Sequence, residues 1–112
     1  MAKIVVGSCK CRRDVAKLVH LLSFRGEYVT IGVGFMEDFS DVLAWADMFV
    51  FYDSPIAMIN MAIEGTGVPI LVMSAFEEFV VRRAFPQSKV HFVNLGIGDE
   101  ELLDRVREVL SA

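Results

Sequence analysis

Short apolar runs alternate along the chain with amphipathic segments. Five runs rich in valine, isoleucine and phenylalanine predict β-strands, at residues 3–6, 28–33, 47–52, 68–73 and 90–94. Each run has the length of a buried strand and is bounded by Gly, Asp, Ser or Pro. Because the runs are apolar throughout, they are typical of parallel strands that helices cover on both faces.

Five helices are predicted between and after these strands, at residues 12–24, 38–46, 54–64, 75–85 and 98–110. Apolar positions recur in each at helical spacing, which predicts one buried face per helix. Ser54 and Pro55 form a helix start signal, since serine caps the first N–H groups and proline suits the first turn. In the fourth helix we expect Phe76, Phe79 and Val80 to point inward.

The strand–helix alternation predicts an α/β fold with a doubly wound parallel sheet. Right-handed crossovers place the helices on both faces of such a sheet. Five strands favour the flavodoxin-like order 2-1-3-4-5. No linker or internal repeat interrupts the pattern, so we expect residues 1–112 to form a single domain.

The composition narrows the class of protein. The 112 residues are 54% hydrophobic, which excludes intrinsic disorder, and no apolar run approaches the roughly 18 residues of a membrane span. The net charge is −4, whereas a domain that binds nucleic acid usually carries a net positive charge. Cys9 and Cys11 are too close in sequence for a favourable disulfide, and no secretory signal opens the chain, so we expect free thiols and a cytoplasmic protein.

Ligands of doubly wound sheets bind at the carboxyl ends of the strands, near the switch point between the first and third. The candidate site residues in the loops of that edge are Gly7, Ser8, Lys10, Arg12, Asp53, Ser54, Ser74 and Asn94. A helix start with Ser8, Lys10 and Arg12 beside it is suited to a phosphate or a carboxylate. The serines equally suit helix capping, which leaves both roles open.

The cysteines offer a second chemistry. Cys9 and Cys11 are candidates for reactive thiols, since Lys10, Arg12 and a helix N-terminus would favour the thiolate. One cysteine pair and two distant histidines fall short of the four clustered ligands of a structural zinc site. We therefore expect no metal and no cofactor.

Four stretches resemble the receiver domains of response regulators: residues 3–6, 47–53, 68–76 and 99–110. They are similar to the first strand, the third strand, the fourth strand with its following loop, and the last helix of that family. The resemblance makes Asp53 the counterpart of the phosphoacceptor, and Ser74 that of the Ser or Thr after the fourth strand.

Two departures from the receiver pattern affect its chemistry. Gly7 and Ser8 stand where the family has acidic residues that hold a divalent cation, and Asn94 and Leu95 replace its Lys–Pro pair. Phosphoryl transfer depends on such positive charge at the transferring group, and Mg²⁺ prefers carboxylate ligands. The resemblance therefore implies a degenerate, non-catalytic receiver that acts by binding another protein.

Residues 4–8, 12–13, 26–30, 46–50 and 67–70 more weakly resemble nucleoside deoxyribosyltransferase-like domains. That family carries a nucleophilic Glu on a helix between these stretches, where Asn60 stands in this chain, and Glu64 lies too close to the following Gly–Val–Pro. The alternative it implies is a binder or enzyme for a nucleoside, nucleotide or sugar phosphate, using the loop after the first strand.

The helix at 54–64 is more apolar than one covering face requires. Met58, Met61 and Trp45 are therefore candidates for an apolar helix face that contacts a protein partner or a second copy of the chain.

Overall fold

The computed structural model describes residues 1–8, 12–34 and 39–111, and of Arg12 it describes the backbone alone. Its centre is a five-stranded parallel sheet in the order β2-β1-β3-β4-β5, which confirms the predicted topology. The strands are β1 (Lys3–Ser8), β2 (Val29–Gly34), β3 (Met48–Tyr52), β4 (Ile70–Ser74) and β5 (Val90–Asn94). All five differ from the predicted runs by two residues or fewer at each end.

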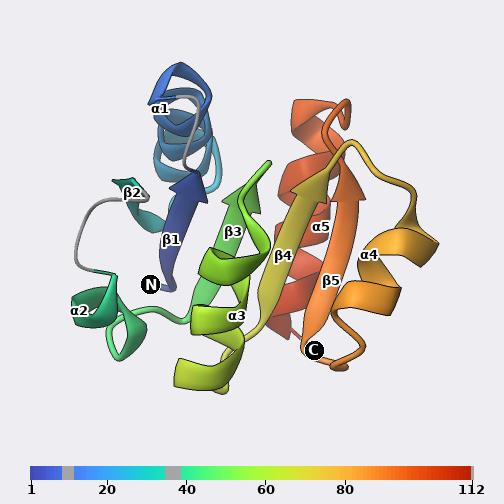
Figure 1. Ribbon diagram of the computed structural model, residues 1–112. Coiled ribbons are helices and arrows are strands. Elements are labelled where there is room, and N and C mark those ends of the chain that lie inside the picture. Colours follow the sequence, from blue (N-terminus) through green and yellow to red (C-terminus); the bar gives the residue numbers. More distant parts are fainter. Residues whose placement is uncertain (9–11, 35–38, 112) are drawn as a thin grey trace.

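Helices cover both faces of the sheet (Figure 1). They are α1 (Arg12–His20), a π-helical continuation η1 (Leu21–Arg25), α2 (Ser40–Leu43), α3 (Ile56–Gly65), α4 (Glu78–Ala84) and α5 (Asp99–Ser111). One face carries α2, α3 and α4, and the other carries α1, η1 and α5 (Figure 1). The doubly wound α/β class is thereby confirmed.

Two separate hydrophobic cores hold the three layers together. The core under α2, α3 and α4 contains a cluster of three phenylalanines, Phe39, Phe49 and Phe51, whose ring centroids lie 5.5–6.0 Å apart. The core under α1 and α5 is aliphatic, with Leu22 and Val106 at its centre. Because β1, β3 and β4 contribute side chains to both cores, their runs are apolar throughout.

One glycine allows the first helix to lie close to the sheet. A Cβ on Gly32 of β2 would come 2.6 Å from Val15 Cγ1 of α1. Any larger residue at this position would push α1 away from β2.

The fourth helix shows a different buried face from the predicted one. Phe76, Phe79 and Val80 are 67%, 62% and 40% exposed, so the prediction that they point inward was wrong. Val81 and Phe85, one helical turn apart, are the residues of this segment that enter the core. The helix begins only at Glu78, after a bend, and this start turns the Val81 face toward the sheet.

No helix in the described ranges is long and apolar enough to cross a membrane.

Substitution of two phenylalanines tests the orientation of α4. Phe85→Ala is expected to lower the free energy of unfolding by about 3–5 kcal/mol, because it leaves a cavity in a packed core. Phe79→Ala is expected to change it by about 0.5 kcal/mol or less, as for other exposed positions. Urea denaturation measures both, and equal losses would contradict the orientation.

Candidate functional site

The carboxyl edge of the sheet brings the predicted strand-end residues to one side of the molecule. Strands β1, β4 and β5 end at Ser8, Ser74 and Asn94, and all strands run in the same direction (Figure 1). Ser74 and Asn94 are register partners, and the backbone N–H of Asp53 donates to the Met73 carbonyl at 3.0 Å. Ser8, Asp53, Ser74 and Asn94 therefore lie at the same edge of the sheet, as the parallel topology requires.

The hydroxyl of Ser54 links two strand ends instead of capping a helix. Its Oγ donates to the Gly7 carbonyl at 2.9 Å and lies 3.4 Å from the Tyr52 carbonyl. Pro55 occupies the N-cap position of α3, with no side-chain cap hydrogen bond. The prediction of Ser54 as the N-cap was therefore wrong, because its hydroxyl pairs with backbone brought close by the fold.

Two other polar side chains of this edge stabilise turns. Ser74 Oγ accepts a hydrogen bond from the Phe76 backbone N–H at 3.1 Å. Asn94 Oδ1 accepts one from the Gly96 backbone N–H at 2.8 Å. Both side chains bond the backbone two residues ahead, which is the pattern of local turns after strands.

Asp53 stands out by its backbone conformation. Its side chain is exposed and its φ is +46°, in the left-handed region that costs a residue with a Cβ about 1–2 kcal/mol. Aspartate and asparagine tolerate this region better than most residues. The exposed Asp53 thus directly follows β3 at the surface of the molecule.

Gly7 serves packing at the switch point between β1 and β3. A Cβ there would lie 2.9 Å from two ring carbons of Phe51 and 3.0 Å from Met58 Cε. The absence of a side chain lets the Phe51 ring and the Met58 thioether pack against the backbone of β1. Ser8, the next residue, is buried.

Several predicted site residues lie outside the described part of the chain. They are Cys9, Lys10 and Cys11, together with the side chain of Arg12. Within the described ranges, no three His, Cys, Asp or Glu side chains lie close enough to share a metal ion.

The apolar surface candidates are distributed differently from the prediction. Met58 is 2% exposed and belongs to the core, whereas Met61 is exposed and Trp45 packs partly against the same core. Three large apolar side chains are exposed on and beside α4. We call these residues, Phe76, Phe79 and Val80, the α4 stripe. Sequence reasoning missed it because the segment 75–85 has two apolar faces.

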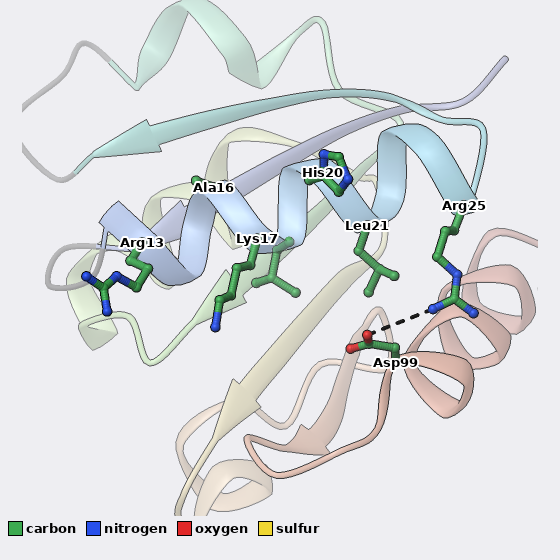
Figure 2. Close-up of a pocket in the computed structure, with 8 residues that line it drawn as sticks. Arg13, Ala16, Lys17, His20, Leu21, Arg25 and Asp99 are labelled. Atoms are coloured by element: carbon green, nitrogen blue, oxygen red, sulfur yellow. Dashed lines mark ion pairs between the residues drawn. The ribbon is translucent and has the colours of Figure 1, made fainter.

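A groove beside α1 was also missed. It has a volume of about 680 Å³, and the residues that line it are Arg13, Ala16, Lys17, Leu18, His20, Leu21, Arg25 and Asp99 (Figure 2). Arg25 forms ion pairs with Asp99 and Glu100 at the start of α5, so the groove runs between α1 and α5. The sequence contains a pattern that could have indicated it. Arg13, Lys17 and Arg25 are four and eight residues apart, which places them on one face of a helix.

Comparisons with known proteins agree with this architecture. No protein-family model matches the chain, and no curated protein matches it. A DNA-binding response regulator of the LuxR family from Staphylococcus aureus has a TM-score of 0.74 at 10% identity, covering 98% of this chain and 99% of that one. A pilus assembly-related protein from Burkholderia pseudomallei K96243 has a TM-score of 0.67 at 16% identity, covering 99% and 90%.

At these identities the similarity shows the fold, and the chain has the receiver-like, flavodoxin-like fold that the sequence predicted.

The positive φ of Asp53 generates a stability prediction. Asp53→Gly is expected to be more stable than Asp53→Ala by about 1 kcal/mol, because glycine adopts φ +46° without the Cβ clash that alanine suffers. Urea denaturation of the two variants measures the difference. An Asp53→Ala variant as stable as Asp53→Gly would show that the left-handed backbone is not retained in solution.

Proposed function

We propose that the chain is a non-catalytic, receiver-like regulatory module that binds another protein through the α4 stripe. The observation that carries this proposal is the exposure of two phenylalanines and a valine within five residues of one another, on and beside one short helix. Single exposed apolar residues are common on protein surfaces, whereas a contiguous group of large ones marks an interaction surface.

The stripe also suggests the chemistry of its partner. Arg83 follows Phe79 by four residues and Val80 by three, so it continues the same helix face, and it is exposed. Arg82, by contrast, donates to the backbone carbonyls of Val90 and Gln87 and is occupied within the chain. We therefore propose a partner segment that is apolar and carries an acidic residue opposite Arg83.

Loss of phosphoryl chemistry is the second part of the proposal. Gly7 and Ser8 supply no carboxylate where receivers bind their cation, and Asn94 with Leu95 supplies no ammonium. The Gly7 backbone is packed against Phe51, and Asn94 Oδ1 is used by a local turn. These roles support a strand-end region that serves the fold, with Asp53 as an inert counterpart of the phosphoacceptor.

The alternative of a nucleoside-processing enzyme receives less support. Asn60, at the place of that family's nucleophile, is half-buried on α3, and the described chain offers no carboxylate at that position. We therefore propose no enzymatic activity for the chain.

Treatment with acetyl phosphate and Mg²⁺ tests the loss of phosphoryl transfer. Intact-mass spectrometry is expected to show no acid-labile adduct, because no cation site stabilises the transferring group. The Asp53→Asn variant is the matched control and should give the same spectrum. A stoichiometric adduct that disappears in Asp53→Asn would contradict the proposal.

Photo-crosslinking tests the α4 stripe as a binding surface. A benzoyl-phenylalanine placed at position 79 is expected to crosslink a single protein, which mass spectrometry identifies and which is then purified. Phe79→Ser is expected to weaken binding of that purified partner by about tenfold or more, as for a central aromatic contact. Phe24 is the matched control, because it is exposed on the opposite layer.

Two outcomes would contradict this binding role. If Phe24→Ser and Phe79→Ser weaken binding of the partner equally, the α4 stripe is not the specific binding surface. If the crosslinked protein is a second copy of the chain, and sedimentation shows a dimer that Phe79→Ser dissociates, the proposed partner is replaced by self-association.

A further inference from the structure

We propose that the groove between α1 and α5 binds a small organic molecule that carries a phosphate monoester. This site lies on the opposite face of the sheet from the α4 stripe and does not depend on it. Its volume of about 680 Å³ lies within the range of roughly 300–1,000 Å³ typical of small-molecule sites.

The side chains of the groove form a regular row. Arg13, Lys17, Leu21 and Arg25 follow one another at intervals of four residues, and Figure 2 shows all four pointing to the same side of the helix. His20 points away from that side in the same view. The row therefore presents three cations and one leucine on one side of the helix, and Arg25 at its end meets the start of α5.

The distribution of charge makes this row attractive to anions. Five of the chain's eleven Lys and Arg residues lie within residues 10–25, which contain one acidic residue, Asp14. The whole chain has a net charge of −4, so this segment is a basic region in an otherwise acidic protein. Such a region concentrates anionic ligands at its surface.

The two ends of the row differ in how their charge is balanced. Arg25 is paired with Asp99 and Glu100 across the groove. Among the described residues, neither Arg13 nor Lys17 has an ion-pair partner. Like charges four residues apart repel each other on a helix, and an anion bound between them would relieve that repulsion.

The chemistry of the lining indicates the class of ligand. A guanidinium and an ammonium together bind a phosphate dianion well, the first by paired N–H donors and the second as a point charge. The wall beyond them is apolar, with Leu18 and Leu21. A ligand with a phosphate between Arg13 and Lys17 and an apolar or ring-shaped part over Leu21 fits both features.

Titration followed by amide NMR tests this site with the full chain. Adenosine monophosphate and glucose 6-phosphate are the probes, inorganic phosphate is the bare anion, and adenosine and glucose are the uncharged controls. At least one ester is expected to shift the amides of residues 13–25 saturably at millimolar concentration and more tightly than inorganic phosphate. The uncharged controls are expected to give no saturable shift.

Matched variants separate the site from general charge attraction. Lys17→Gln and Arg13→Gln are each expected to weaken ester binding by about tenfold, the effect of removing one charge-assisted hydrogen bond. Arg83→Gln removes an exposed cation from the other layer and is expected to leave the affinity unchanged. All three side chains are exposed, so the variants are expected to fold like the parent chain.

Four results would overturn the proposal. If neither ester gives saturable amide shifts, the groove is not a binding site. The same conclusion follows if Arg83→Gln and Lys17→Gln weaken ester binding equally. Inorganic phosphate binding as tightly as the esters would leave an anion site without an organic ligand. Shifts of the same amides by an oligoglutamate peptide but by neither ester would assign the groove to an acidic protein segment instead.

Discussion

Burial of the central strands on both faces is the constraint on which the rest of the structure depends. The side chains of β1, β3 and β4 alternate between two cores, so helices must cover both faces of the sheet. The close fit is visible at Gly7, where a single added carbon would meet the Phe51 ring. The parallel order of these strands brings their polar end residues to one carboxyl edge.

The fold was predictable because strands that are buried on both faces appear in the sequence as continuous apolar runs. Continuous apolar runs gave the strands within two residues at each end, and the strand–helix alternation gave their order. The orientation of α4 was not predictable in the same way. Phe79 and Val81 belong to two apolar faces of one short segment, and only the bend before Glu78 decides which face meets the sheet.

The candidate sites were predictable only in part. Parallel strands bring Ser74 and Asn94 to one edge, and this follows from the topology alone. The hydrogen bond from Ser54 to Gly7 joins residues 47 positions apart, so no local pattern reveals it. The α1 groove likewise includes Asp99, which lies 74 positions or more from the other lining residues and reaches them only in the folded chain.

The two faces of the molecule thus have different surface chemistry, one apolar at the α4 stripe and one basic along α1. The central claim is that the stripe is open to solvent and available for a partner. Hydroxyl-radical footprinting of the isolated chain measures this most directly, with Phe24 as the exposed reference and Phe85 as the buried one. Oxidation of Phe76 and Phe79 at rates close to that of Phe24 is the predicted result, whereas protection of both to the level of Phe85 would contradict the account.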